Sequence, residues 1–212
     1  MFRLSSLRFA LLAAALSLPV AAQVQVFGGT GSRMASTKIF FDKALVGMIC
    51  VQFGQPEWKD SYDGMMDKLK GKQLRLGKDF WTTLNNTIPM DIGGVSVAPG
   101  SWYLGLHCDD KGAFSLLVID QKPADEAGWG PFMPGPWKAT YTVPLTMAAT
   151  DKVQELMLVE INGEDAAKLT FEVHWGMHKL SAPVVAHLAG EKKGADADAH
   201  AKHEAASDGK KK

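Results

Sequence analysis

Short hydrophobic runs alternate with turn-forming residues along most of the chain, and the clearest series lies between Lys72 and Asp120. Runs rich in Val, Ile, Leu, Trp and Tyr that are bounded by Asn, Gly, Pro and Asp are typical of β-strands. Trp102–Cys108 and Phe114–Asp120 are separated by a polar loop that ends in Gly112, a residue that tolerates positive φ. The pattern predicts that these two runs form an antiparallel hairpin at the centre of a sheet.

Further strands are expected on both sides of this hairpin. Leu45–Phe53 is apolar almost throughout, which indicates a strand that is covered on both faces. The other expected strands are Ala139–Leu145, Glu155–Asn162, Lys168–Trp175 and Lys179–Val185. Apolar and polar residues alternate strictly in Lys168–Trp175, so one face of this strand should be exposed to solvent and the other buried. Gly176 and Met177 are expected to turn the chain after it.

Two segments between the strands differ in pattern. In residues 58–70 the apolar side chains of Tyr62, Met65, Met66 and Leu69 recur at helical spacing, and Gly71 follows, so one short helix packed on the sheet is predicted. Residues 121–137 contain four prolines and three glycines, and regular structure is not expected there. We therefore predict a mainly β protein, an antiparallel β-sandwich of jelly-roll or immunoglobulin-like type, with a barrel as the alternative.

The two ends of the chain differ from this core in composition. Arg3 and Arg8 precede the apolar run Phe9–Leu18, and small residues at Val20 and Ala22 predict a secretory signal peptide over residues 1–22. A membrane anchor is the alternative, but the run is short for a span. We expect a lead-in segment over residues 23–44, the sandwich over 45–186 and a disordered charged tail over 187–212. The predicted location is the periplasm or the extracellular space.

The charge balance and the cysteine content limit the partners and the cross-links that can be expected. The chain has 23 basic and 23 acidic side chains, so no long-range field indicates nucleic acid as a partner, and no membrane insertion is expected after signal cleavage. Cys50 and Cys108 are the two cysteines, and each falls in a predicted strand. If those strands face each other, a disulfide would stabilise the fold by roughly 3 to 5 kcal/mol. The alternative is two buried free thiols that never meet.

The order of several segments resembles a family of exported bacterial domains known as domain of unknown function twenty-nine eleven. These segments are FGQP (Phe53–Pro56), GKDFWTTLNN (Gly77–Asn86), VAPGSWYL (Val97–Leu104), FSLLVID (Phe114–Asp120) and LTFEVHWGMHKLSAPV (Leu169–Val184). The resemblance covers roughly Leu45–Val185, nearly the whole expected core.

The most specific part of this resemblance is the family stretch G-K-x-W-R-T-G-A-N-E-A-T. Five residues match it with one residue inserted before the tryptophan: Gly77, Lys78, Trp81, Thr83 and Asn86. Thr82 and Thr87 stand where the family has Arg and Glu, and Leu84 and Asn85 replace its Gly and Ala. Because Arg and Glu are the members that could orient an anion or a sugar, the resemblance implies a fold and a compartment but no reaction.

Aromatic residues in the Pro- and Gly-rich loop suggest a binding platform. Trp129 and Trp137 either fold back as a plug over the core or stand exposed for a ligand. In the second case we expect them to combine with Trp81, Asn85 and Asn86, because amides beside indoles suit a carbohydrate or another small polar ligand. The leading interpretation is an exported, non-enzymatic binding or structural module that uses no cofactor.

Two other functional classes stay open from the sequence. His107 and Asp109 share a strand face and could serve a hydrolase or isomerase on a jelly-roll scaffold, although no known hydrolase motif is present. His174 and His178 flank the expected turn at Gly176 and could face each other across a hairpin. For a metal-handling accessory protein, the candidate ligands are His200 and His203, together with His187 and the acidic residues of the tail.

Overall fold

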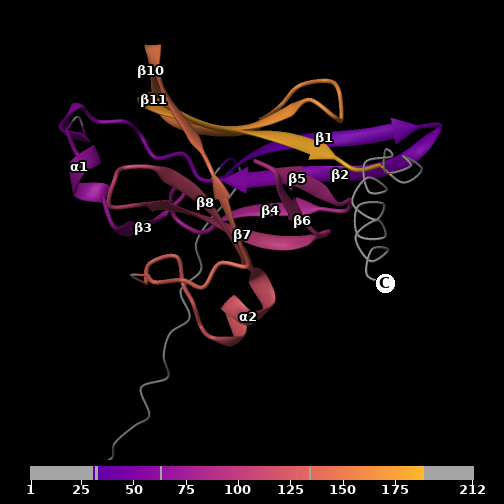
Figure 1. The fold of residues 1–212 in the computed structure, drawn as a ribbon, viewed down its shortest axis with the longest axis horizontal. Helices are drawn as coiled ribbons and strands as arrows, with labels where there is room; N and C mark the ends of the chain where they lie inside the picture. The colour runs from indigo at the N-terminus through magenta and orange to yellow at the C-terminus, as the bar shows by residue number, and fades with distance from the viewer. Residues whose placement is uncertain (1–30, 32, 63, 134, 189–212) are drawn as a thin grey trace, which may run out of the picture.

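The structure, a computed structural model, describes residues 31, 33–62, 64–133 and 135–188, and these residues form two packed antiparallel β-sheets (Figure 1). The predicted β-sandwich is confirmed. The predicted signal peptide and the tail from residue 189 onward lie outside the described residues, so the cleavage site and the candidate ligands His200 and His203 lie outside them as well.

The first sheet is built around the predicted central hairpin. Its strand order is β1-β2-β4-β7-β8-β9, and β3 pairs with the second half of β7, beyond the half that pairs with β4. The strands are β1 (Met34–Asp42), β2 (Ala44–Phe53), β3 (Lys72–Arg75), β4 (Thr82–Asn86), β7 (Gly100–Cys108), β8 (Phe114–Asp120) and β9 (Tyr141–Pro144). In the hairpin Leu104 lies opposite Val118, so the predicted pairing of β7 with β8 is confirmed.

The second sheet has the order β10-β11-β5-β6. Its strands are β10 (Thr146–Asn162), β11 (Leu169–Ala186), β5 (Met90–Ile92) and β6 (Val95–Val97). The chain passes from one sheet to the other at buried Leu145, between β9 and β10. β10 and β11 are long and pair at both ends of β10, with an irregular stretch between Ala149 and Leu158, and they lie opposite the first sheet.

The main core fills the space between the two sheets. It takes the inward side chains of alternate residues, such as Leu104 and Leu106 of β7 and Phe171 and Val173 of β11, all of which are buried. The predicted alternation in Lys168–Trp175 is therefore confirmed, with Phe171 inward and Glu172 outward. This period-two burial is what specifies the sandwich.

Two regions depart from the prediction. The expected lead-in contains β1, an edge strand whose side chains are mostly exposed, so it carries no buried stripe that a hydrophobic pattern would reveal. The predicted helix over residues 58–70 is broken into the single 3₁₀ turn η1 (Asp60–Tyr62) and the short helix α1 (Met66–Leu69). Gly64, at φ +75°, lies between them and interrupts the helical backbone.

The Pro- and Gly-rich segment begins with a helix that was not expected. This is α2 (Gln121–Glu126), and the side chain of Asp120 caps it by accepting a hydrogen bond of 3.0 Å from the backbone N–H of Lys122. Pro123 fits in the first turn because the N–H groups there have no partner within the helix. The segment then packs on the outer face of the first sheet (Figure 1).

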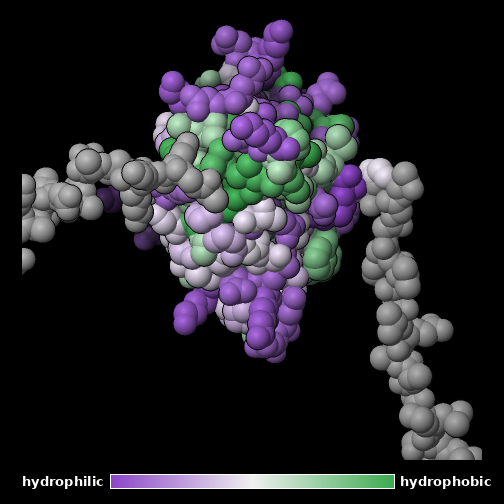
Figure 2. Space-filling model, turned by 90° about the vertical axis from the view of Figure 1, so that its right-hand side faces the viewer, coloured by the Kyte–Doolittle hydropathy of each residue, from purple (hydrophilic) through white to green (hydrophobic). Residues whose placement is uncertain are grey.

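One end of the sandwich carries exposed hydrophobic side chains. Ile39, Phe41 and Leu45 lie near the β1–β2 turn and are 65%, 72% and 68% exposed. Figure 2 looks onto this end and shows hydrophobic surface between hydrophilic regions. Within the described part of the chain, no helix has the length and apolar character that crossing a membrane requires.

Candidate functional site

The tryptophans of the predicted platform are packed inside a second hydrophobic cluster. We call this the outer cluster; its buried members are Trp81, Tyr103, Leu117, Ile119, Ala124 and Trp137. The Trp81 ring stacks on Tyr103 with centroids 5.2 Å apart and meets Trp137 edge-on at 4.8 Å. Trp81 is 1% exposed and Trp137 is 6% exposed, and Trp129 packs against them partly buried. The expectation of an exposed platform is wrong here, because protein atoms already cover these ring faces.

The two asparagines of the predicted platform bond to the protein itself. Asn86 is 3% exposed; its Nδ2 donates to the carbonyls of Ile88 and Ala98 at 2.9 Å each, and its Oδ1 accepts from the indole of Trp102 at 2.9 Å. Asn85 accepts a hydrogen bond of 2.8 Å from Ser101. Asn86 points toward the main core, whereas Trp81 belongs to the outer cluster, so the five predicted residues do not line one groove.

The other sequence candidates take structural positions. Asp109 closes the β7–β8 turn by accepting from the N–H groups of Lys111 and Ala113 at 2.9 and 2.8 Å. The hydrogen bond from Ala113 contributes most to holding the pKa of the Asp109 carboxyl below its usual value. Among the described residues, no group of three or more His, Cys, Asp or Glu side chains is placed to hold a metal ion.

Cys50 and Cys108 are both free and buried. Cys50 in β2 lies opposite Asn85 of β4, which in turn lies opposite Ser101 of β7. Cys108 is seven residues further along β7, a distance of about 20 Å at the rise of a strand. A disulfide requires Cα atoms within about 7 Å, so the alternative of two separate thiols is the one realised.

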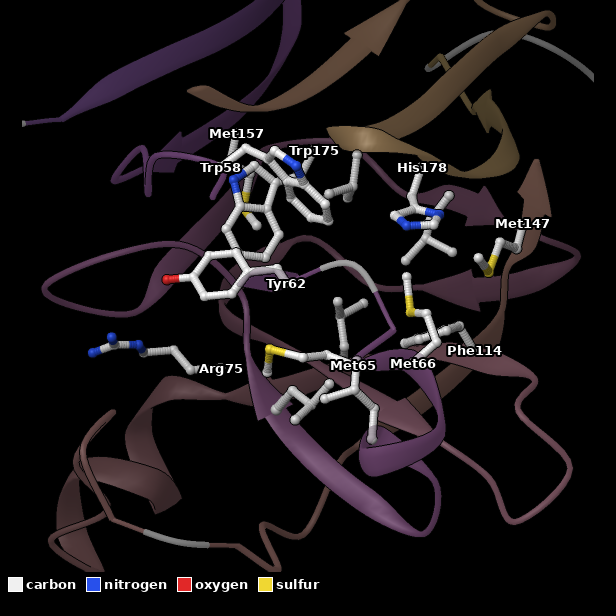
Figure 3. A pocket seen from close by; sticks show the side chains of 15 residues that line it. Trp58, Tyr62, Met65, Met66, Arg75, Phe114, Met147, Met157, Trp175 and His178 are labelled. Carbon is white, nitrogen blue, oxygen red and sulfur yellow. The ribbon is translucent and has the colours of Figure 1, made fainter. Parts of the chain in front are cut away.

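A pocket of about 350 Å³ opens between the two sheets, at the end where α1 lies (Figure 3). Most of its lining is aliphatic, aromatic or thioether carbon. The lining residues are Trp58, Tyr62, Met65, Met66, Leu69, Leu74, Arg75, Leu106, Phe114, Met147, Met157, Val173, Trp175, His178 and Leu180. They come from β3, β7, β8, β10, β11 and the connection that follows β2.

A bulge in the β10–β11 pairing at Gly176 shapes one wall of this pocket. The backbone of Gly176 is at φ +60°, and β11 continues through it to Ala186, so the predicted turn at Gly176 and Met177 is wrong. Inward side chains have odd numbers up to Trp175 and even numbers from His178 onward. The side of β11 that faces the pocket thus changes between Trp175 and His178, so both of these side chains line the pocket. The register with β10 is irregular on both sides of Gly176, and the extra residues lie in β10.

Three aromatic rings form the wall beside this bulge. Trp58 packs edge-on against Trp175 at 5.0 Å and against Tyr62 at 5.7 Å, and Tyr62 lies 5.2 Å from Trp175. His178 is also 5.7 Å from the Trp58 ring. We call Trp58, Tyr62 and Trp175 the pocket wall; in Figure 3 they stand together above the methionines of α1 and its flank.

Hydrogen bonds hold the pocket wall in place. The indole N–H of Trp175 donates to the carbonyl of Pro56 at 2.9 Å, and the backbone N–H of Trp58 donates to the carbonyl of Glu155 at 2.6 Å. A cross-strand bridge between Glu57 and Leu156 reinforces this attachment to β10. The Trp58 and Trp175 rings are therefore positioned by backbone bonds between residues 56–58 and β10 and by the bond from Trp175 to Pro56, although each ring is only partly buried.

Sequence reasoning missed this site because its parts are distant in the chain. The sequence pattern places Tyr62 on one face of a helix that begins after Trp58, and it places Trp175 and His178 on either side of a turn. Their aromatic character was a signal, but nothing local indicates that residues 58 and 175 meet. Comparison with models of known protein families, with curated proteins and with solved structures gives no match to this chain.

Proposed function

We propose that this protein is a non-enzymatic binding module whose ligand is largely apolar and enters the pocket between the two sheets. The observation that carries the proposal is the pocket itself, which has about 350 Å³ of space and is lined mainly by Met, Leu, Phe and Trp side chains. Small-molecule sites typically have such volumes and such a lining.

The lining favours binding over catalysis. Among the described residues that line the pocket, His178 is the side chain that most often acts as a general base in enzymes. No described Ser, Cys, Asp or Glu lines the pocket beside it. Methionine side chains adapt their shape to an apolar ligand at little cost. A flexible hydrocarbon chain suits this lining better than a carbohydrate, whose hydroxyl groups would find few partners.

The cellular context of the proposal rests on the sequence. The basic and apolar pattern of residues 1–22 supports export, and the resemblance to domain of unknown function twenty-nine eleven agrees with an exported bacterial domain. We therefore propose that the module acts in the periplasm or outside the cell. There it would bind an apolar compound that water dissolves poorly.

A series of straight-chain alcohols tests the proposal on the full chain. If the chain of the alcohol enters the pocket, each added methylene should tighten binding by about 0.8 kcal/mol, or about fourfold, until the pocket is full. Tryptophan fluorescence reports the binding, because Trp58 and Trp175 line the pocket. Affinity that does not depend on chain length would contradict the proposal.

Two methionine variants provide a matched comparison. Met147 lines the pocket and is 42% exposed, whereas Met133 lies in the segment over the outer face and is 50% exposed. Met147→Trp should occupy part of the pocket and weaken dodecanol binding by about tenfold, a change of about 1.4 kcal/mol. Met133→Trp adds the same indole elsewhere and should leave binding within about twofold. Equal effects of the two variants would place the ligand outside the pocket.

A further inference from the structure

The pocket has one fixed charge. Of the described residues that line it, Arg75 is the one with a permanently charged side chain, and none is a carboxylate. Arg75 ends β3 and lies opposite Gly105 of β7, so its position is set by a paired strand rather than by a loop. An apolar opening with a single cation and no balancing anion is complementary to a ligand that carries a negative charge at one end.

The Arg75 side chain lies at the outer edge of the pocket, and its guanidinium is next to the segment that covers the outer face of the first sheet. The guanidinium carbon lies 5.0 Å from the centre of the Phe132 ring, and Nη1 donates to the carbonyl of Asp79 at 3.4 Å. Phe132 is 75% exposed, so the ring holds the cation without covering it from water. Arginine has five N–H donors, and these contacts leave donors for an anionic group.

The polar and apolar sides of the pocket are separated. In Figure 3 the hydroxyl of Tyr62 and the guanidinium of Arg75 point to the same side of the opening. Met66, Phe114 and Met147 lie toward the opposite side. A ligand with a charged head and a hydrocarbon tail would match both sides in a single orientation, with the head at the rim and the tail inside.

We propose that the ligand is a single-chain amphiphile with a carboxylate head, such as a fatty acid, and that Arg75 binds the carboxylate. A guanidinium matches a carboxylate in shape and can donate two parallel hydrogen bonds to it. A bidentate pair of this kind contributes more than an ordinary surface ion pair, even where water reaches it. The inference rests on the proposed function and adds the class of head group and the residue that selects it.

The test compares dodecanoate, dodecanol and dodecylamine, each below the concentration at which micelles form, on the full chain. Dodecanoate should bind about tenfold more tightly than dodecanol, and dodecylamine more weakly than either. Arg75→Met keeps an apolar stem over the pocket but removes the charge, so it should weaken dodecanoate binding about tenfold and leave dodecanol within about twofold. Raising the salt concentration should reduce the preference for dodecanoate in the parent protein.

Two further variants separate this role from a general effect of charge. Lys72→Gln removes an exposed cation from the same strand outside the pocket lining and should change neither affinity. Arg75→Lys keeps the charge without the planar fork and should restore part of the preference, and it also serves if Arg75→Met does not fold. Equal binding of dodecanoate and dodecanol by the parent, or equal losses in Arg75→Met and Lys72→Gln, would overturn the role of Arg75 but leave the pocket intact. Binding of no amphiphile at all would overturn the proposed function as well.

Discussion

The outer cluster and the pocket wall are built from the same kinds of side chain but have different consequences. In both, tryptophan and tyrosine rings meet at centroid distances between 4.8 and 5.7 Å. In the outer cluster Trp81 and Trp137 are almost wholly buried, whereas Trp58, Tyr62 and Trp175 keep part of their surface on an open pocket. The comparison indicates that a group of aromatic residues can offer a surface to a ligand only where the fold leaves the ring faces uncovered.

The segments that cover the two regions explain the difference. The segment after α2 is fastened to the first sheet by Gln73, whose side chain hydrogen-bonds both the N–H and the carbonyl of Trp137. These two bonds keep the segment over the outer cluster, so its rings stay buried. The connection after β2 is anchored at Trp58, but its helical part is interrupted at Gly64, and Met65 and Met66 remain only partly buried. The segment after α2 therefore covers the outer cluster, whereas the connection after β2 flanks the pocket and leaves it open.

Alanine substitutions at Trp81 and Trp58 should separate the two regions most strongly. Trp81→Ala removes a fully buried indole and should lower the free energy of unfolding by about 3 to 5 kcal/mol, a large part of a domain's stability. Trp58→Ala removes a partly buried ring and should cost about 1 to 2 kcal/mol. Urea denaturation at low temperature measures both changes.

Binding should respond in the opposite order to these two substitutions. Folded Trp81→Ala, or Trp81→Phe if the alanine variant does not fold, should bind dodecanol with unchanged affinity because the outer cluster lies on the other face of the first sheet. Trp58→Ala should lose about tenfold in affinity, because a ring of the pocket wall is missing. If Trp81→Ala weakened binding more than Trp58→Ala does, the two regions would not be independent.

Gly176 offers a second way to test the pocket wall. A Cβ at this position would lie 2.5 Å from the ring of Trp58, and the backbone is at φ +60°, so Gly176→Ala should cost about 2 to 3 kcal/mol and displace the ring. Gly128 has a similar φ of +67° but no atom within 4 Å of its would-be Cβ, so Gly128→Ala should cost about 1 kcal/mol. Thermal unfolding gives the two costs.

Measuring the affinity for dodecanol separates the effect of each glycine substitution on the pocket from its effect on stability. Gly176→Ala should weaken it severalfold, and Gly128→Ala should leave it unchanged, since both carry the same kind of backbone strain but only one touches Trp58. Equal stability losses and equal affinities in the two variants would show that the pocket wall does not depend on the close approach of Trp58 to β11.

Local patterns predicted much of the fold and little of the site. The β7–β8 hairpin and the alternation in β11 follow from residues adjacent in the chain, so a period of two was sufficient to predict them. Gly176 shows the limit, because a glycine at positive φ suits both a turn and a bulge, and only pairing with β10 decides between them. The β1 strand was missed because its alternate half-buried positions, Ser36, Lys38 and Phe40, are not consistently apolar.

The site required information that no local pattern contains. Trp137 stands in a Pro- and Gly-rich loop, where the sequence allows both a plug and an exposed ligand platform; the contact with Gln73 of β3 decides for burial. Trp58 and Trp175 meet because residues 56–58 bond to β10, which pairs with β11, and these contacts join segments that are distant in the chain. Burial of an aromatic ring depends on its distant neighbours, and these are what the sequence pattern omits.

The smallest expected effect concerns Tyr103, which the outer cluster buries at 6% exposure. Burial, and after it the hydrogen bond of 2.8 Å to Asp125, raises the pKa of Tyr103 to about 12. An unfolded chain loses this proton near pH 10, whereas the folded protein keeps it to about pH 12. The contribution of Tyr103 to stability should therefore be present in full below pH 10 and be lost as the pH rises through 12.

Denaturation at pH 8 and at pH 11 measures this contribution. Tyr103→Phe should cost about 1 kcal/mol at pH 8, because a hydrogen bond to Asp125 is lost, and less at pH 11, where the parent protein has itself lost stability. The difference between the two proteins should therefore shrink with rising pH. A constant difference would mean that water reaches the hydroxyl and that the outer cluster is less tightly closed than the pocket comparison requires.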